Sequence, residues 1–366
     1  MMPGTRHISV LVADDSAFMR TALRRMIESD DALSVVDTAC DGVDALAKVH
    51  KLRPDVVTLD IEMPRLNGLN TLKHIMLQCP RPVIMVSSLT QEGAQVTLDA
   101  LDFGAFDYIS KDLSYASLDI VKIRKDLIAK IKAAASSATF SADPPAISQL
   151  PSAAFSPKLV RARARAPEIV CIGTSTGGPK ALQQLLPTLP ASFPSGILIV
   201  QHMPPGFTGP FAQRLNGICK IHVREACDHD PIEPGVALIA PAGWHMLPVR
   251  TGNKPFVQLT KEPGDTLHRP AVDLTMLAAA SVFGPATLGV IMTGMGDDGA
   301  RGMTAIHDCG GYTIGQDEAS CAVYGMPRSC AELGILDSVV PLDGLGHAIM
   351  QHCRNSRPAF ATAPLH

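Results

Sequence analysis

Short β-rich apolar runs that end at polar or glycine-rich turns occur in two separate series along this chain. The first series is ISVLVA at 8–13, VVTL at 56–59 and PVIMV at 82–86, with helix-like stretches at 16–28, 44–52 and 93–103. The second series is EIVCIG, GILIV and LGVIM, from residue 168 onwards. Strands that alternate with helical segments form βαβ units on a parallel sheet. We therefore expect two α/β domains.

The segment between the two series has a different composition. Residues 136–166 are rich in Ala, Ser and Pro, show no periodicity and end in RARARA, which predicts a linker. The basic run is interpreted as part of a solvated tether, with a functional basic patch as the alternative. The predicted division is a first domain at 1–135, the linker at 136–166, a second domain at 167–353 and a C-terminal tail at 354–366.

The second domain is expected to be doubly wound and mostly parallel, with one departure from the βα alternation. Between residues 231 and 260, PGVALIAPAG and KPFVQLTKE predict a β-hairpin excursion. In open α/β sheets, ligands bind outside the carboxyl ends of the strands. Polar residues that follow the apolar runs are therefore the candidates for function.

Composition supports two folded domains and argues against several classes of function. The chain has 366 residues, of which 46% are hydrophobic and 18% charged, enough for two apolar cores. A net charge of −3 and an aromatic content of 4% argue against nucleic-acid binding. Nine cysteines without a CxxC pair predict free thiols in a reducing compartment. With no signal-like N-terminus and no membrane-spanning run, we expect a cytoplasmic protein without membrane insertion.

Oxygen ligands collect at the ends of the apolar runs in the first domain. Asp14 and Asp15 follow the first run, and Asp60 follows the run at 56–59. Neighbouring strand ends would crowd these carboxylates, and Mg²⁺ relieves such repulsion. Ser87 and Lys111 follow later runs and are suited to stabilising a phosphoryl group. Each residue alone could be a turn or cap residue, but five such groups in one unit favour a functional site.

This constellation resembles the receiver domain of response regulators over about residues 7–125. The resemblance implies a (βα)5 fold with Asp60 as the phosphoacceptor, and Mg²⁺ bound by Asp14, Asp15, Asp60 and the backbone carbonyl of Glu62. It also implies that Ser87 and Lys111 contact the phosphoryl group and that Tyr108 is the aromatic switch residue. Receivers usually have Pro after this lysine, whereas this chain has Asp112, so a different loop geometry is expected there.

A serine on a glycine-rich turn marks the second domain. Residues 173–177, GTSTG, fit the pattern G-x-S-x-G, whose glycines allow a sharp turn that exposes the Ser175 hydroxyl at a helix start. Backbone N–H groups at such a helix N-terminus can stabilise an oxyanion. The motif alone fits a structural turn or a phosphate cradle equally well, although the G-x-G-x-x-G spacing of dinucleotide sites is absent.

A serine nucleophile at neutral pH needs a base and an acidic partner for that base. His202 ends the next apolar run, and four other histidines compete with it: His222, His229, His245 and His268. The acidic partner is expected after LGVIM, as Asp297 or Asp298, and spacing does not choose between the two. The order Ser, His, Asp differs from that of α/β-hydrolases, so the motif does not predict that fold.

Four motifs that follow the receiver-like segment decide between these interpretations. They are GTSTGGP, QHMPPGFT, HRPAVD and MTGMGDDGA, and together they closely resemble the chemotaxis protein-glutamate methylesterases of the CheB family over about residues 168–352. The resemblance implies a triad of Ser175, His202 and Asp298, and the backbone N–H of Met295 in the oxyanion hole. It places Thr176, His268 and Arg269 along the cleft. The family often has HRPSVD, so Ala271 lacks a hydroxyl, a loss expected to alter substrate contacts but to leave the triad intact.

The function implied by the resemblance is phosphorylation-activated hydrolysis of glutamyl γ-methyl esters, and deamidation of glutamines, on methyl-accepting chemotaxis receptors. The implied phosphodonor is a chemotaxis histidine kinase, and phosphate on Asp60 is expected to release a receiver that obstructs the cleft. Mg²⁺ is expected in the receiver and no cofactor in the catalytic domain; a monomer is the default. The alternatives are an esterase for a sensory protein outside chemotaxis, a phosphate-switched binding protein and, least favoured, a dinucleotide-dependent oxidoreductase.

Overall fold

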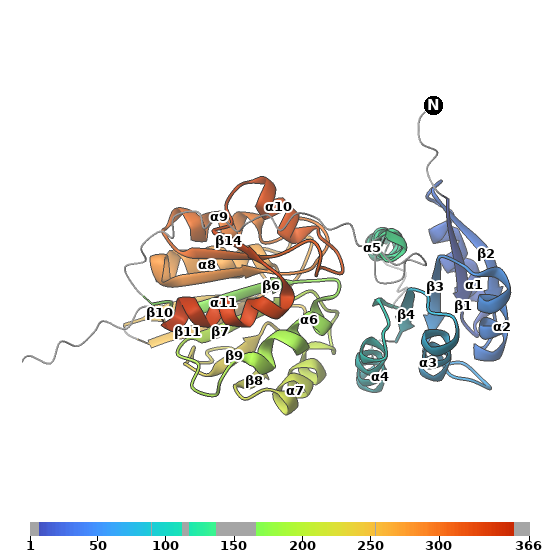
Figure 1. The fold of residues 1–366 in the computed structure, drawn as a ribbon, viewed down its shortest axis with the longest axis horizontal. Helices are drawn as coiled ribbons and strands as arrows, with labels where there is room; N and C mark the ends of the chain where they lie inside the picture. Colours follow the sequence, from blue (N-terminus) through green and yellow to red (C-terminus); the bar gives the residue numbers. More distant parts are fainter. Residues whose placement is uncertain (1–6, 89, 112–116, 137–165, 253, 355–366) are drawn as a thin grey trace, which may run out of the picture. The chain divides into compact units, whose positions relative to one another are not determined.

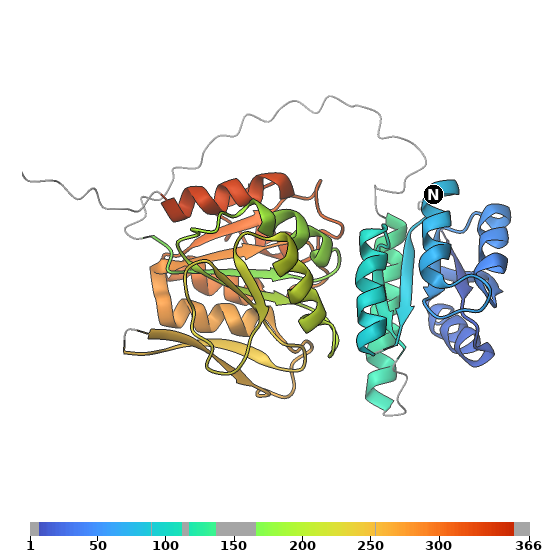
Figure 2. The ribbon, with the colours of Figure 1, turned by 90° about the horizontal axis from the view of Figure 1, so that it is seen from below.

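The computed structural model of the chain describes residues 7–88, 90–111, 117–136, 166–252 and 254–354. The chain folds into two compact units, Met1–Ala153 and Ala154–His366, each built on its own parallel sheet (Figures 1 and 2). Nearly all of the predicted linker and C-terminal tail, and Asp112, lie outside the described residues. Among the described helices, none combines the length and the apolar character needed to cross a membrane.

The first unit alternates strands and helices throughout, as expected from its apolar runs. Its strands form a five-stranded sheet in the order β2-β1-β3-β4-β5, and all neighbouring strands are parallel. The elements are β1 (Ile8–Ala13), α1 (Ala17–Ile27), β2 (Leu33–Ala39), α2 (Gly42–Leu52), β3 (Val56–Asp60), α3 (Gly68–Gln78), β4 (Val83–Ser87), α4 (Gln91–Asp102), β5 (Asp107–Ser110) and α5 (Ser117–Ser136).

The topology of the first unit places helices on both faces of its sheet. The chain moves from β1 outward to β2 and then returns past β1 to β3, β4 and β5. Because parallel crossovers are right-handed, this reversal puts α1 and α5 on one face and α2, α3 and α4 on the other. Packing of α1 against α5, and of α2, α3 and α4 in series, agrees with this. Strands covered on both faces read as continuous apolar runs, and Val10, Leu11 and Val12 are fully buried.

Local sequence explains where the helices of the first unit begin. The side chains of Ser16, Asp41, Asn67 and Thr90 each accept hydrogen bonds from backbone N–H groups in the first turn of α1, α2, α3 and α4. Such N-cap bonds satisfy donors that the helix itself leaves unpaired. These caps fix the starts of the four helices, which lie three to eight residues after the preceding strand ends.

The second unit is a seven-stranded parallel sheet in the order β14-β13-β12-β6-β7-β9-β8, with a separate two-stranded hairpin. Its strands are β6 (Ile169–Thr174), β7 (Gly196–Gln201), β8 (His222–Glu225), β9 (Val236–Ile239), β10 (His245–Thr251), β11 (Lys254–Thr260), β12 (Thr287–Ile291), β13 (Tyr312–Gln316) and β14 (Ser338–Val340). Its helices are α6 (Gly178–Leu185), α7 (Thr208–Ile218), α8 (Val272–Phe283), α9 (Ala300–Asp308), α10 (Met326–Glu332) and α11 (Leu342–Arg354), with 3-10 turns η2 (Leu186–Thr188) and η3 (Gly284–Ala286).

The direction of winding reverses at the centre of the second sheet. From β6 the chain moves to β7 and the β8 edge, and it later returns to β12 on the other side of β6 and moves on to β13 and β14. Right-handed crossovers then put α6 and α7 on one face and α8, α9 and α10 on the opposite face. The carboxyl ends of β12, β6 and β7 therefore meet at a topological switch point, where α/β sheets bind ligands.

One sequence-based expectation about the second unit needs correction. PGVALIAPAG does not belong to a hairpin: it contains β9, which pairs in parallel with β7 and β8 inside the central sheet. The hairpin is made by β10 and β11, which pair antiparallel from His245–Thr260 to Thr251–Lys254. An apolar run of four to six residues fits either partner, and the distinction depends on tertiary pairing that the pattern does not contain.

Candidate functional site

Ser175 lies on the turn between β6 and α6, at the switch point of the second sheet. Gly177 has φ +77°, and a Cβ there would lie 2.5 Å from the Cβ of Ala322, so the turn needs glycine at this position. The Ser175 N–H donates to the carbonyl of Thr293 at 3.0 Å, and the Gly178 N–H donates to the Ser175 carbonyl at 2.8 Å. These two N–H groups hold the turn, and the expectation that N–H groups at this helix start stabilise an oxyanion stays a prediction.

His202 and Asp298 are joined by a hydrogen bond at the same end of the sheet. His202 follows β7, Asp298 lies in the loop after β12, and His202 Nε2 is 2.8 Å from Asp298 Oδ2. An ionised carboxylate only accepts hydrogen bonds, so this contact places the imidazole proton on Nε2. The other ring nitrogen, Nδ1, is buried and has no hydrogen-bond partner among the described residues. It is therefore the nitrogen that can accept a proton.

The carboxylate of Asp298 is held in its ionised form by its surroundings. The backbone N–H of Val272 donates to Oδ2 at 2.8 Å, and that of Asp273 donates to Oδ1 at 2.9 Å. Burial acts to raise the pKa of Asp298, but the hydrogen bond and charge of His202 and these two N–H groups outweigh it, so the pKa is lowered. The structure thus chooses Asp298 over its exposed neighbour Asp297 as the partner of the histidine.

Gln201 ties the backbone of the serine to that of the histidine. Its side chain is buried, and its Nε2 donates to the carbonyl of Ser175 at 3.0 Å and to the carbonyl of His202 at 2.9 Å. One amide therefore links the ends of β6 and β7. Sequence analysis missed this residue, although a glutamine that ends an otherwise apolar strand run is itself a signal, because buried amides need partners.

The competing histidines have other surroundings. His245 is fully buried on β10, where its Nδ1 accepts the N–H of Ala271 at 3.2 Å, and burial lowers its pKa. His222 and His229 are exposed, on β8 and in a loop. His268 stacks on His202, with ring centroids 3.9 Å apart. The structure therefore places His268 beside His202, and its role in lining the cleft stays a prediction.

The segment after β12 passes directly over the serine. A Cβ on Gly294 would lie 2.9 Å from the Cβ of Ser175, so only glycine permits this approach. Met295 directly follows Gly294 in the chain and is half-buried. The Thr176 side chain is buried, and its carbonyl accepts the Thr293 hydroxyl at 2.9 Å. Arg269 donates from Nη2 to the Gly264 carbonyl at 2.9 Å and lies in the loop that leads into α8.

A second group of chemically active side chains lies at the carboxyl ends of β1 and β3 in the first unit. Asp14, Asp15 and Asp60 each contribute one carboxylate oxygen to a cluster. These three oxygens all lie within 4.8 Å of one another. Lys111 Nζ lies 2.6 Å from Asp60 Oδ2 and 3.3 Å from Asp14 Oδ2. The Asp60 Oδ1 accepts the N–H of Glu62 at 3.2 Å. The expected cluster is therefore assembled by the fold.

The acidic cluster has too little positive charge for its carboxylates. Burial raises the pKa of Asp60 to about 6 and also raises that of Asp14, although Lys111 opposes both shifts. Apart from the ion pair with Lys111, Asp14 Oδ2 and Asp60 Oδ2 are buried without a hydrogen-bond partner among the described residues. Buried oxygens in need of a partner and three convergent carboxylates are what a hard divalent cation requires. The residues present therefore fit Mg²⁺.

The two other predicted switch residues, Ser87 at the end of β4 and Tyr108 on β5, contact groups outside the acidic cluster. The Ser87 hydroxyl is buried, 2.7 Å from Thr97 Oγ1 and 3.1 Å from the Ser88 carbonyl. It is thus bonded to α4 and its own loop. Tyr108 is 4% exposed, and the Lys130 ammonium lies 5.4 Å from its ring centroid. Burial raises the pKa of Tyr108 well above its ordinary value.

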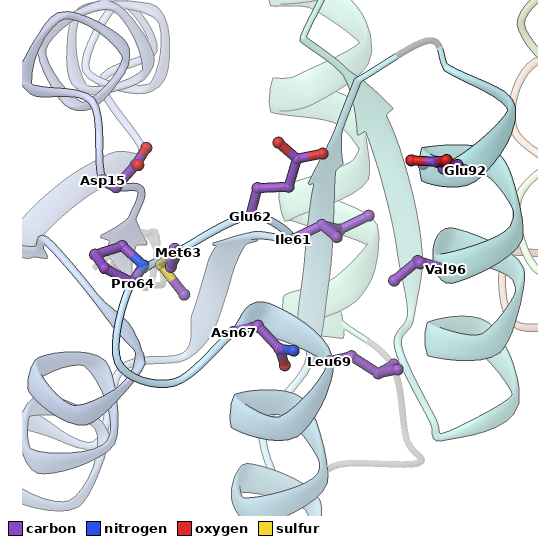
Figure 3. A pocket seen from close by; sticks show the side chains of 10 residues that line it. Asp15, Ile61, Glu62, Met63, Pro64, Asn67, Leu69, Glu92 and Val96 are labelled. Atoms are coloured by element: carbon purple, nitrogen blue, oxygen red, sulfur yellow. The ribbon is translucent and has the colours of Figure 1, made fainter.

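A cavity of about 590 Å³ opens beside the acidic cluster. Figure 3 shows it between the loop that follows β3 and the first turns of α3 and α4. Its apolar lining includes Ile61, Met63 and Val96, and Asp15, Glu62 and Glu92 add three carboxylates. Because Asp15 belongs to both, the cavity is an extension of the acidic cluster, open to an approaching molecule.

The folds and sites together define a class of protein: a phosphoacceptor-type (βα)5 unit joined to a doubly wound unit with a Ser, His and Asp set at its switch point. The family model of the CheB methylesterase matches residues 170–349, and that of the response regulator receiver domain matches residues 10–121. The chain belongs to the CheB methylesterase family and has a response regulator receiver domain.

Individual relatives agree with this assignment. The chain is 47% identical over 363 residues to a protein-glutamate methylesterase/protein-glutamine glutaminase of Oleidesulfovibrio alaskensis, with 94% of this chain and 98% of the relative covered. It is also 47% identical to a protein of the same description from Pyrococcus abyssi, with 96% and 95% covered. The crystal structure of the Thermotoga maritima CheB methylesterase catalytic domain covers 51% of this chain and 98% of that chain, with 40% identity and a TM-score of 0.50.

Proposed function

We propose that this protein hydrolyses the γ-methyl esters of glutamate side chains on chemoreceptors, deamidates glutamine side chains there, and is activated by phosphorylation of Asp60. One observation carries the catalytic part: His202 is bonded to Asp298 through Nε2 and leaves a buried Nδ1, unpartnered among the described residues, beside the turn that holds Ser175. Full-length relatives described as protein-glutamate methylesterase/protein-glutamine glutaminase support the choice of substrate.

In the proposed mechanism, the Ser175 oxygen attacks the γ-carbonyl carbon while His202 Nδ1 takes the hydroxyl proton. Asp298 accepts from Nε2–H throughout and stabilises the imidazolium that forms. The tetrahedral intermediate collapses, the proton passes from Nδ1 to the leaving oxygen, and methanol departs. Water then attacks the acyl-enzyme with His202 as base, giving the glutamate carboxylate and restoring Ser175. An amide follows the same course and releases ammonia.

The N–H groups of Ser175 and Gly178 are already bonded within the fold, so the developing oxyanion needs other donors. The backbone N–H of Met295 is the proposed donor, and the close approach of Gly294 to Ser175 supports this. Removing one such donor typically costs about 10²–10³-fold in kcat. Thr176, His268 and Arg269 are proposed to line the substrate cleft.

Regulation is proposed to begin at the acidic cluster. An Asp60 oxygen attacks the phosphorus of a phosphohistidine on a chemotaxis histidine kinase, the P–N bond breaks, and the donor imidazole takes up a proton. Asp14, Asp15, Asp60 and the Glu62 carbonyl would hold Mg²⁺, which neutralises charge on the phosphoryl oxygens. The new phosphoryl group, roughly −1.5 to −2 in charge, then competes for Lys111, and Ser87 and Tyr108 are proposed to transmit the change. Receptors and kinase meet such an enzyme in the cytoplasm, where we propose that it acts.

The test is methanol release from methyl-labelled chemoreceptor membranes, with and without Mg²⁺ and acetyl phosphate. We expect release that acetyl phosphate stimulates, that Ser175→Ala abolishes, and that in Asp60→Ala no longer responds to the phosphodonor. Release that persists in Ser175→Ala would contradict the serine mechanism. An absence of release from authentic receptors, with Asp60 still phosphorylated, would instead point to a phosphate-switched binding protein or to another sensory substrate.

A further inference from the structure

The N-termini of α8 and α9 are capped by each other's carboxylates. Neither helix has a side-chain cap from its own N-cap residue. Instead, the first N–H groups of α8, from Val272 and Asp273, donate to Asp298, which lies just before α9. In return, Asp273 Oδ1 accepts the N–H groups of Gly299 at 3.0 Å and Gly302 at 2.9 Å. Four backbone donors that the helices cannot satisfy are thereby paired across the two elements.

Close helix packing makes this exchange possible. A Cβ on Gly302 would lie 2.4 Å from the Cβ of Met276 and 3.2 Å from the Asp273 carbonyl oxygen, so α9 lies directly against α8. The entry into α8 is fixed as well, because the N–H of Ala271 donates to the buried ring of His245 at 3.2 Å. Three successive N–H groups, at 271, 272 and 273, are therefore held by side chains from elsewhere in the chain.

We infer that Asp273 is a positioning residue for catalysis, because it fixes the segment that orients Asp298 toward His202. The inference rests on the proposed roles of those two residues. Asp273 holds the N–H of Gly299, the residue directly after Asp298, so the backbone on which the Asp298 side chain is mounted cannot rotate freely. Asp298 Oδ2 is shared between the Val272 N–H and His202 Nε2, so a displaced Asp298 would release the imidazole.

The contribution of Asp273 is an oxygen acceptor rather than a charge. Only Oδ1 makes the two bonds to α9, and an amide oxygen at the same place can accept both of them. Burial and the neighbouring Asp298 charge raise the pKa of Asp273, against the N–H bonds that it accepts, so a negative charge is disfavoured there. Asparagine is therefore the conservative replacement, and alanine removes both bonds.

The test compares Asp273→Ala and Asp273→Asn with the wild-type chain. Asp337→Ala is the matched control, because Asp337 Oδ2 also accepts backbone and hydroxyl donors, from Thr313 at 2.9 and 3.0 Å, but Asp337 lies directly before β14 and bonds to β13. The first readout is the steady-state kinetics of methyl-ester hydrolysis, kcat and KM. The second is the NMR signal of the proton on His202 Nε2, which is hydrogen-bonded to Asp298. A misplacement of about 1 Å near the reacting groups costs roughly 10²-fold in rate.

We expect Asp273→Ala to lower kcat about 10- to 100-fold with KM within about twofold, and to weaken or shift the Nε2 proton signal. Asp273→Asn is expected to restore both, and Asp337→Ala to lower thermal stability without changing either. Equal kcat and an unchanged proton signal in Asp273→Ala would overturn the inference, as would losses in Asp337→Ala of the same size.

Two further measurements cover the cases in which Asp273→Ala does not fold or the wild-type chain is inactive on the methyl ester. If Asp273→Ala does not fold, Asp273→Glu keeps the charge and moves the acceptor by one methylene group; we expect at least a roughly fivefold loss of kcat there, and wild-type kcat would overturn the inference. If the wild-type chain releases no methanol, the proposed substrate fails. The Nε2 proton signal still tests Asp273 in that case, because it needs no substrate.

Discussion

The receiver and the catalytic unit both gather carboxylates at the ends of parallel strands, yet they treat these carboxylates in opposite ways. In the receiver, burial raises the pKa of Asp60 to about 6 and that of Asp14 as well, with Lys111 as the nearby cation. In the catalytic unit, the pKa of Asp298 is lowered against its burial by His202 and two backbone N–H groups. The receiver carboxylates have too few partners to stabilise their negative charge, whereas the Asp298 carboxylate has enough.

This difference matches what each site has to do. A switch must respond to an added ligand, so carboxylates that gain strongly from a cation or a phosphoryl group are useful there. A nucleophile–base–acid set works best when its groups are already oriented and need no reorganisation during the reaction. The same strand-end architecture can therefore produce a responsive site and a pre-organised one, depending on the partners of the carboxylate: His202 and two backbone N–H groups lower the pKa of Asp298, whereas Lys111 and the Glu62 N–H do not outweigh the burial of Asp60.

The largest effect is expected when the charge of Asp298 is removed, because this tests whether the catalytic site depends on an ionised carboxylate. We expect Asp298→Asn to lower kcat by about 10³–10⁴-fold, because an amide can present its N–H₂ to Nε2 and favour the wrong imidazole tautomer. Asp297→Asn is the matched control, since Asp297 is the exposed neighbour, and it should stay within about twofold of wild type. Equal losses in both variants, measured by methanol release, would contradict the role of Asp298.

In the receiver, the pH dependence of the free energy of unfolding tests whether the charge of Asp60 lacks stabilising partners. A folded-state pKa of about 6 for Asp60, against an ordinary value near 4, means that the folded receiver holds more protons than the unfolded chain between about pH 4 and 6. Its free energy of unfolding therefore falls as pH rises through this window. Asp60→Asn should stabilise the receiver by about 1–3 kcal/mol at pH 7.5, and Mg²⁺ should stabilise wild type more at pH 7.5 than at pH 5.

Hydrogen exchange of receiver peptides in the full chain measures these changes, with peptides of the catalytic unit as the internal control. The opposite slope, with stability that rises from pH 4 to 6, would show that Asp60 is not strained by its burial. Stabilisation by Mg²⁺ that survives unchanged in Asp60→Asn would place the cation elsewhere.

A smaller effect is expected from the amide that joins the two catalytic strands. Gln201→Met keeps the volume but removes the donors to the Ser175 and His202 carbonyls. Leaving a buried acceptor unpaired costs about 1–3 kcal/mol, and we expect kcat to fall about tenfold as the serine and histidine lose their common support. Gln258→Met, an exposed site on β11, is the control. Wild-type kcat in Gln201→Met would mean that the turn and β7 position these residues unaided.

The smallest effect concerns the Ala271 departure from the family pattern. Ala271 is the N-cap residue of α8, and serine there would ordinarily add about 1 kcal/mol through a cap bond. Here the N–H groups of Val272 and Asp273 are already bonded to Asp298, so Ala271→Ser should change kcat less than about twofold and stability by under about 0.5 kcal/mol. A large gain in melting temperature would show that Asp298 does not cap this helix fully.

The sequence predicts the candidate site residues because the ends of strands are easy to recognise as the ends of apolar runs. A residue that follows an apolar run lies at the carboxyl end of a strand, whatever the chain does next. This is enough to predict one group of Asp14, Asp15 and Asp60 and a second group of Ser175 and His202. It could not choose between Asp297 and Asp298, because the choice depends on which carboxylate meets the N-terminus of α8, an element 25 residues earlier in the chain. That contact exists only after α8 and α9 have packed.

The same limit explains the other misses. PGVALIAPAG has the composition of a strand, but only the completed sheet shows that it pairs with β7 and β8 rather than within a hairpin. The turn at Ser175 is recognisable from GTSTG, whereas the engagement of its N–H by Thr293 depends on a loop 118 residues later. Long-range backbone bonds of this kind leave no local pattern for sequence analysis to detect.

The most direct measurement of the contrast between the two sites is methanol release by the full chain in a chelator, compared with Mg²⁺ and acetyl phosphate. If the catalytic groups are pre-organised and only the receiver needs a cation, basal release should continue in chelator at its usual rate. The stimulation by acetyl phosphate should disappear there and return with Mg²⁺. Loss of basal release in chelator, restored by Mg²⁺ in Asp60→Asn as well as in wild type, would contradict the account.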